Sequence, residues 1–191
     1  ADLTVPFLGI NLGTRGFLAE VNKTDLEHAL LRLIEGDYEI EKRMMLTGDV
    51  FQEDRDMPED STQALNDIVI TRKGSLQIII FTISVNGQFL HRYSADGMIV
   101  ATPTGSTGYN LSAGGPVVDP KAQLMVISPI CPHSMQHSSI VLSPEDEVTI
   151  SIDTGHDGTG QEVEASFDGK HRVTLRTGDR IVIRRSSRTT G

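Results

Sequence analysis

Length, composition and charge limit the functions that are open to this chain. Its 191 residues suit one domain, or one and a half, and can bury roughly 70% of the unfolded-chain surface. Its 26 acidic residues outnumber the 17 basic ones, and the net charge of −9 disfavours nucleic acid and anionic membranes as partners. No apolar run approaches the roughly 20 residues that span a bilayer, and residues 1–20 lack a signal-peptide pattern. We therefore expect a cytoplasmic protein with no membrane or nucleic-acid partner.

One amphipathic helix is predicted early in the chain. Thr24 and Glu27 have the spacing of a capping box, and Gly36 supplies a stop. Between them the apolar residues recur with helical periodicity, at Leu26, Ala29, Leu30, Leu33 and Ile34. We expect a surface helix that covers a core with this face. Further on, residues 55–63 show no apolar period and are expected to form a mobile loop.

Most of the remaining pattern is typical of strands joined by tight turns. Asn86-Gly87 and Asp168-Gly169 are typical hairpin turns between alternating apolar segments. The strand-like segments are QIIIFTISV (77–85), QFLHRY (88–93), EVTISI (147–152), EVEASF (162–167), HRVTLR (171–176) and RIVIRR (180–185). This succession of hairpins predicts an α+β fold that is mainly β, with antiparallel sheets packed face to face as in a β-sandwich and a few helices.

The uncharged segment ATPTGSTGYNLSAGGP (101–116) is the strongest candidate for a site. It begins as a buried strand and continues as a short helix start that glycines soon end. No lysine follows Gly105 or Gly108, so the segment is not a P-loop, and a ligand here would meet backbone amides and hydroxyls. The alternative is a tight strand-to-helix connection in which the glycines only permit close packing.

Three other features favour a structural interpretation. The single cysteine, Cys131, lies after an apolar run between prolines and is expected to be a packed thiol. His156 and Asp157 match no metal-ligand spacing and are expected in a polar surface loop. An arginine-rich segment near the end alternates with Ile181, Val182 and Ile183, which indicates a strand edge rather than a nucleic-acid site.

Six ordered sequence blocks resemble the signature of NAD kinases. They are GINLGTRGFLAEV (9–21), ALND (64–67), ADG (95–97), TPTGSTGYNLSAGGP (102–116), SPICPHS (128–134) and FDGK (167–170). The resemblance implies that ATP, with a divalent metal such as magnesium, donates its γ-phosphate to the 2′-hydroxyl of the adenosine ribose of NAD, giving NADP. It also implies a homodimer or homotetramer, because sites in this family are completed across subunits.

The resemblance further implies which residues bind NAD. Asn66 and Asp67 match an Asn-Glu pair that binds the adenosine moiety, with the acid shorter by one methylene, although an Asn-Asp pair alone is also typical of a turn. The run Thr107–Ser112 matches an adenine-contacting segment, and Asp96 matches a nicotinamide-side ligand that acts across a subunit contact. The full implied set is Asn66, Asp67, Asp96, Thr107, Gly108, Tyr109, Asn110, Leu111, Ser112 and, at the edge of the site, Lys170.

The chain also departs from the family pattern. A Gly-Gly-Asp-Gly motif, whose aspartate is held to orient or deprotonate the reactive hydroxyl, does not occur in the sequence, and Ser138 and Ser139 replace an expected Arg-Pro. We expect residues 1–20 to end an N-terminal α/β half and residues 21–191 to form the NAD-binding, β-rich C-terminal domain. The chain by itself should then bind NAD without catalysis.

Two other classes of function compete with this one. The alternative is a non-catalytic NAD(P)-binding or assembly module. A lipid kinase of the related superfamily is disfavoured, because the dinucleotide-side blocks are intact and no membrane-binding surface is apparent.

Overall fold

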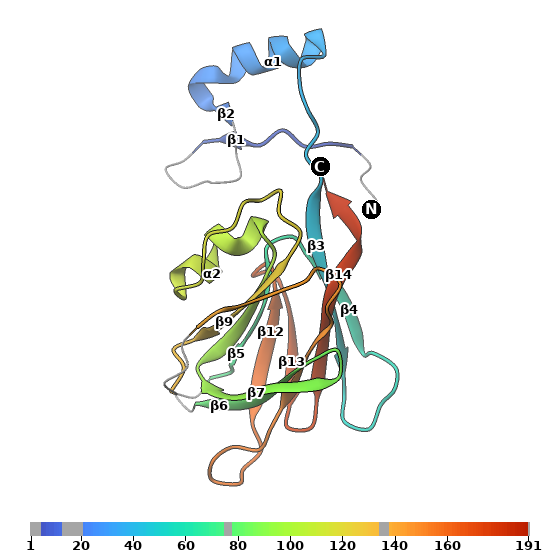
Figure 1. The fold of residues 1–191 in the computed structure, drawn as a ribbon, viewed down its shortest axis with the longest axis vertical. Coiled ribbons are helices and arrows are strands. Elements are labelled where there is room, and N and C mark those ends of the chain that lie inside the picture. The colour runs from blue at the N-terminus through green and yellow to red at the C-terminus, as the bar shows by residue number, and fades with distance from the viewer. Residues whose placement is uncertain (1–4, 13–20, 75–77, 134–137, 191) are drawn as a thin grey trace.

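The computed structural model describes residues 5–12, 21–74, 78–133 and 138–190, and most of its strands belong to two six-stranded antiparallel sheets (Figure 1). The first sheet contains, in spatial order, β10 (Ile140–Leu142), β9 (Met125–Ile130), β8 (Gly97–Ala101), β5 (Asp67–Arg72), β12 (Glu162–Phe167) and β13 (His171–Arg176). The second contains β4 (Asp60–Ala64), β3 (Arg43–Phe51), β14 (Arg180–Thr190), β11 (Val148–Ile152), β6 (Ile79–Val85) and β7 (Gln88–Ala95). The predicted fold, mainly β with packed antiparallel sheets and a few helices, is confirmed.

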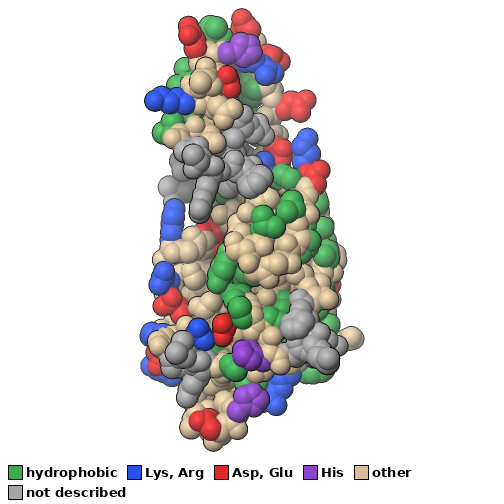
Figure 2. All heavy atoms as spheres, turned by 90° about the vertical axis from the view of Figure 1, so that its left-hand side faces the viewer, with side chains coloured by type: hydrophobic (Ala, Val, Ile, Leu, Met, Phe, Trp, Pro, Cys, Tyr) green, Lys and Arg blue, Asp and Glu red, His purple; other side chains and the backbone are tan. Residues whose placement is uncertain are grey.

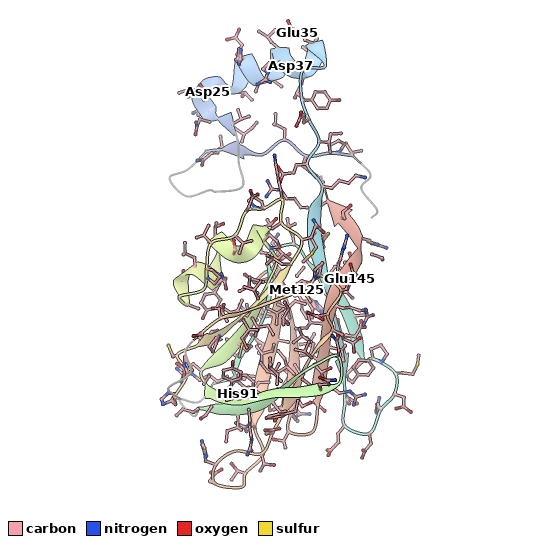
Figure 3. All side chains as sticks on the ribbon, viewed as in Figure 1. Asp25, Glu35, Asp37, His91, Met125 and Glu145 are labelled. Atoms are coloured by element: carbon pink, nitrogen blue, oxygen red, sulfur yellow. The ribbon has the colours of Figure 1, made fainter. Side chains whose placement is uncertain are left out.

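Apolar side chains from both sheets fill the space between them. Ile68 and Phe167 of the first sheet join Phe81 and Ile150 of the second in one buried cluster. Figure 3 shows the side chains of this interior, with Met125 of β9 among them. At Gly48 in β3 the sheets approach so closely that a Cβ atom would lie 2.8 Å from the Phe167 ring, so this position requires glycine.

Strand β8 is buried on both of its faces. Met98 and Val100 point into the core between the sheets, whereas Ile99 and Ala101 point to the outer face of the first sheet. There a second, smaller cluster joins Ile99 and Ala101 to Val69 and Ile130, with Ala113 packed against it. A strand that is covered on both faces needs apolar residues at every position, which explains the continuous run predicted as a buried strand.

The two predicted hairpin turns are confirmed, but other strand pairings are not. Asn86 and Gly87 between β6 and β7, and Asp168 and Gly169 between β12 and β13, all have positive φ, as tight hairpin turns require. The expected succession of hairpins is wrong elsewhere, because β11 pairs with β14 and β6 while β12 pairs with β5 and β13. Residues 153–161 therefore cross between the sheets. The arginine-rich β14 lies between β3 and β11, so it is an interior strand rather than an edge.

Two local predictions are also corrected. The expected loop 55–63 ends in β4, whose residues pair with β3. Cys131 is exposed rather than packed, because it directly follows the end of β9 with a φ of 44° and lies outside both apolar clusters. His156 and Asp157 lie on the surface as predicted. Within the described residues, no helix is both long and apolar enough to span a bilayer.

The N-terminal segment stands apart from the sandwich (Figure 1). It contains β1 (Ile10–Asn11), β2 (Val21–Asn22), the 3₁₀ turn η1 (Lys23–Asp25) and helix α1 (Leu26–Glu35). Strands β1 and β2 pair in parallel across the expected boundary between residues 20 and 21.

Helix α1 forms where it was predicted, but two features of the prediction are wrong. Gly36 ends the helix with a φ of 74°, as expected. The capping box does not form, because η1 precedes the helix and the Thr24 hydroxyl donates to the adjacent Asp25 carboxylate. No residue of α1 is buried, and Ile34 is 83% exposed, so in this chain the helix covers no core.

Candidate functional site

The uncharged segment forms a loop, residues 102–118, on the outer face of the first sheet. It leaves β8 at Ala101, forms the 3₁₀ turn η2 (Thr104–Thr107) and the short helix α2 (Tyr109–Ser112), and returns toward β9. The loop rests on the smaller apolar cluster through Ala113. The sequence predicted a strand followed by a short helix start that glycines soon end, and the structure has this arrangement.

The turn before β5 is locked against the start of this loop. The Thr102 amide donates to the Asn66 carbonyl over 2.9 Å, and the Thr102 hydroxyl donates to the Leu65 carbonyl over 2.6 Å. The same hydroxyl accepts the Gly105 amide at 3.1 Å. A Cβ atom at Gly105 would collide with the Asn66 carbonyl oxygen, so only glycine allows this approach. The turn at Asn66 and the start of the loop at Thr102–Gly105, far apart in sequence, are thus in direct contact and together form one edge of the candidate site.

Asp168 holds this turn from the opposite side. Its carboxylate accepts the amides of Leu65 at 2.8 Å, Asn66 at 2.7 Å and Asp67 at 3.2 Å. The Asp168 amide donates back to the Asp67 carbonyl over 3.1 Å. The sequence pattern gave Asp168 a role only in a hairpin turn, because a carboxylate that binds amides about 100 residues away leaves no local signal.

The two polar side chains of this turn, Asn66 and Asp67, are poorly hydrated. Asp67 is 7% exposed, and burial together with the nearby Asp168 carboxylate raises the pKa of Asp67 to about 6. A Cβ atom at Gly108 would lie 4.0 Å from Asp67 Oδ2, so this carboxyl borders the start of α2. Asn66 Oδ1 is buried and finds no hydrogen-bond partner among the described residues. Both groups can therefore accept hydrogen bonds from a ligand.

The loop has a buried side and an exposed side. Asn110 is fully buried, and its side-chain amide donates to the carbonyls of Ser106 and Pro116. Tyr109 and Leu111, on either side of it, are 45% and 42% exposed. Gly108 and Ser112 are also exposed, and Thr107 is half-buried. Figure 2 shows the side of the molecule that carries α2, and uncharged atoms predominate in the middle of this face.

The predicted NAD-binding residues do not all lie together. The structure places Asn66 and Asp67 beside η2 and α2, and Lys170 follows the Asp168-Gly169 turn that anchors them. Asp96 lies at the other end of the same strands, because Asp67 pairs with Ala101 and Thr71 with Gly97. Asp96 is five positions from Ala101 along the chain, about 16 Å at the usual rise of a strand. There Asp96 forms an ion pair with Arg72 at 3.0 Å.

Two hollows in the surface lie away from this site. One, of about 340 Å³, is lined by Ile80, Arg92, Tyr93, Ser94, Gly155 and His156. The other, of about 530 Å³, shares Arg92 and is otherwise lined by Glu53, Thr82, Ile152, Asp153, Thr154, Thr177 and Gly178. Both border the crossover of residues 153–161 and neither includes Asn66, Asp67 or the loop 102–118. Neither hollow therefore coincides with the candidate site.

Comparison with known proteins first identifies the class. Residues 65–190 match the family model of the ATP-NAD kinase C-terminal domain, so the sandwich and its loop belong to a phosphotransferase family. The chain is 44% identical to the NAD kinase of Lachnoclostridium phytofermentans over 185 residues, 97% of this chain and 65% of that protein. It is 44% identical to the NAD kinase of Lachnospira eligens over 197 residues, 98% of this chain and 67% of that protein.

Solved structures agree with this class. Yeast NADH kinase complexed with NADH superposes with a TM-score of 0.84 at 32% identity, covering 95% of this chain and 51% of that one. An NAD kinase from Archaeoglobus fulgidus in complex with ATP superposes with a TM-score of 0.80 at 29% identity, covering 97% of this chain and 67% of that one. The chain belongs to the NAD kinase family and corresponds to the C-terminal domain of its members. It spans 65% of the length of the L. phytofermentans relative.

Proposed function

We propose that this chain supplies the NAD-binding part of an enzyme that transfers the γ-phosphate of ATP to the 2′-hydroxyl of the adenosine ribose of NAD, giving NADP. The observation that carries the proposal is the edge where the Asn66–Asp67 turn meets Gly105. It contains a buried amide oxygen that has no hydrogen-bond partner among the described residues and, at the next position in sequence, a poorly hydrated carboxyl. Ribose hydroxyls and the adenine amino group are donors that such acceptors bind.

The neighbouring loop supports an adenosine ligand rather than a phosphate. The predicted contact run, Thr107–Ser112, offers hydroxyls and the Tyr109 ring, and it contains no basic side chain. An aromatic ring can stack on adenine, and the Asp67 carboxylate would repel a phosphate placed beside it. Asn110 serves by holding the loop, since both of its amide hydrogens are used inside the chain.

The phosphoryl donor and the reactive aspartate are assigned to residues outside this chain. Among the described residues, no group of three His, Cys, Asp or Glu side chains could hold a metal ion, so we assign no magnesium ligand to them. The magnesium that accompanies ATP would then be held by the triphosphate and by other residues. Without a base near the 2′-hydroxyl, proton transfer loses a factor of about 10² to 10⁴ in rate. The chain alone should therefore bind NAD and make no NADP.

Asp96 is assigned to a different copy of the site. It lies too far from Asp67 to contact the same adenosine, and the resemblance implies a nicotinamide-side ligand that acts across a subunit contact. In a homodimer or homotetramer it would contact a dinucleotide that is held by a neighbouring subunit. Loss of affinity on Asp96→Ala should then disappear under conditions that keep the chain monomeric.

Binding is tested by titrating the chain with NAD or NADP and following backbone amide shifts and heat. We expect shifts at residues 65–67 and 104–112. Asp67→Ala should lose more affinity than Asp67→Glu, because the longer acid can still accept from ribose. Asp157→Ala, at an exposed acid of the crossover, is the matched control and should bind normally. Equal losses for the two Asp67 variants, or no shifts at the site, would contradict the assignment.

Catalysis is tested separately with NAD, ATP and magnesium. The chain alone should give no measurable NADP, and a longer protein that includes an upstream Gly-Gly-Asp-Gly segment should give NADP readily. NADP formation by the chain alone would refute the placement of the reactive aspartate. If the longer protein binds NAD and is also inactive, a non-catalytic NAD(P)-binding module becomes the better description.

A further inference from the structure

A relay of hydrogen bonds, buried at Asn110 and half-buried at Ser139, runs beneath the loop 102–118. Its first member is Asn110, whose side-chain nitrogen lies 3.1 Å from the Ser106 carbonyl and 3.0 Å from the Pro116 carbonyl. Reversing this amide would place an oxygen against two carbonyl oxygens, so the contacts fix its orientation. Asn110 Oδ1 therefore faces the other way and can only accept.

The direction of the remaining bonds follows from counting hydrogens. Ser128 Oγ lies 2.6 Å from Asn110 Oδ1 and 2.7 Å from Ser139 Oγ. A serine hydroxyl has one hydrogen, and that of Ser128 must go to Asn110 because Oδ1 cannot donate. Ser139 is then the donor to Ser128. The relay runs in one direction, from Ser139 through Ser128 to Asn110.

Asn110 transmits this constraint to the exposed side of the loop. Its backbone carbonyl accepts the Gly115 amide at 2.9 Å, and a Cβ atom at Gly115 would collide with its side chain. The neighbours of Asn110 in α2 are Tyr109 and Leu111, both exposed. These contacts of Asn110 thus fix the backbone from which the two outward-facing side chains project.

We propose that Ser139 is a positioning residue for the nucleotide site, which acts on the loop 102–118 through Ser128 and Asn110. The ligand in this inference rests on the proposed function, whereas the relay does not. Ser139 lies on the segment that leads into β10, outside the residues assigned to NAD, and it is only half-buried. When the Ser139 hydroxyl is removed, Ser128 still donates to Asn110 but loses the donor that orients its own hydroxyl.

The test compares Ser139→Ala with two matched variants. Ser138→Ala removes a hydroxyl from the exposed neighbour, and Ser139→Thr keeps the donor. The first readout is amide hydrogen exchange of Gly115 and Val118 without ligand, because these amides are bonded to Asn110 and to the Ser106 hydroxyl. The second readout is the Kd for NAD. We expect Ser139→Ala to raise the exchange rates of these amides and the Kd for NAD about three- to tenfold, as the loss of one half-buried neutral hydrogen bond implies.

A double-mutant cycle shows whether Ser139 acts through Ser128. Ser128→Ala should raise the exchange rates and the Kd more than Ser139→Ala does, because it leaves Asn110 Oδ1 buried without a donor. The double variant should match Ser128→Ala alone. Additive effects, equal effects of Ser139→Ala and Ser138→Ala, or no rescue by Ser139→Thr would each overturn the proposal. If exchange responds as expected but even the parent chain does not bind NAD, the positioning of the loop stands and the proposed function fails.

Discussion

The sandwich and the N-terminal segment of this chain use apolar residues in opposite ways. In residues 43–190, two sheets bury their facing side chains completely at many positions. Among the described residues between 5 and 42, none is buried. The exposed large apolar residues there are Val5, Phe7, Leu8, Ile10, Leu12, Leu30, Leu31, Leu33, Ile34, Tyr38 and Ile40. Periodicity indicates that a face is apolar, but it does not identify what that face packs against.

This difference in burial has a physical cause, because the sandwich is antiparallel and the N-terminal sheet is parallel. Antiparallel strands of the sandwich form two layers that cover each other. Strands β1 and β2 are parallel and two residues long, and parallel sheets are ordinarily covered on both faces. Helix α1, at ten residues, is below the length at which an isolated helix is stable in water. Only the sandwich therefore has the contacts of an independently stable unit.

The sharpest way to break this comparison is to truncate one isoleucine in each region. Ile150→Ala, at a fully buried position of β11, should lower the free energy of unfolding by about 2–5 kcal/mol. Ile34→Ala, at the exposed end of α1, should change it by less than about 0.5 kcal/mol. Urea unfolding of both variants measures the difference. A comparable loss in the two would show that α1 is packed against the chain after all.

A second prediction concerns the closest approach within the site. Gly105→Ala should cost about 1–3 kcal/mol and weaken NAD binding, because the new methyl group would push the Asn66 turn away from the loop. Gly160→Ala is the matched control, since a Cβ atom there meets nothing within 4 Å. Urea unfolding and a calorimetric titration with NAD check the two effects. If Gly105→Ala behaves like Gly160→Ala, the edge is not as tightly closed as the geometry requires.

The third prediction follows from the acidic pair at the same edge. The pKa of Asp67 is raised from 3.8 to about 6 by burial and by Asp168, so between these pH values the folded chain binds more protons than the unfolded one. The free energy of unfolding contributed by this group therefore falls as pH rises from about 4 to about 6, and the loss persists above pH 6. Asp67→Asn should stabilise the sandwich by roughly 1–2 kcal/mol at pH 7 and by little at pH 4.

Urea unfolding across this pH range measures the effect. Asp119→Asn, at an exposed position after the loop, should leave the profile of the parent unchanged. An Asp67→Asn variant that follows the parent profile throughout would mean that Asp67 is ionised in the folded chain at no cost.

The smallest expected effect tests whether the two regions unfold together. Gly36 ends α1 and Gly74 follows β5, and both have positive φ with open space where a Cβ atom would lie. Alanine at either position should cost about 1 kcal/mol locally. Gly36→Ala should reduce the helical circular dichroism without moving the unfolding midpoint of the sandwich, whereas Gly74→Ala should lower that midpoint. Equal midpoint shifts would show that the regions are coupled.

Local sequence signals predicted the elements of this fold better than their partners. The turns at Asn86-Gly87 and Asp168-Gly169 were predictable because positive φ has a residue preference. The crossover of residues 153–161 was not, because no local pattern tells a strand which sheet it joins. The same limit explains α1, whose apolar face was correctly predicted and whose packing was not.

The candidate site shows the same division. Matching motifs named Asn66, Asp67 and the run Thr107–Ser112, and the structure brings these together. Motif order could not show that Asp96 lies about 16 Å along the strands, since spatial separation is not encoded in the blocks themselves. Nor could it show the relay through Ser128, because each hydroxyl is ordinary in its own segment.

The anchoring of the 65–67 turn by Asp168 also sets the order in which the molecule can become competent to bind. Asp168 lies 101 to 103 residues after the amides that it accepts, so a chain made from its N-terminus completes this turn late. A partial chain can contain the whole loop 102–118 and still lack the hairpin of β12 and β13. Because a ligand stabilises only the state that binds it, NAD would favour chains whose sandwich is already closed. Ligand binding would then act as a check on completed folding.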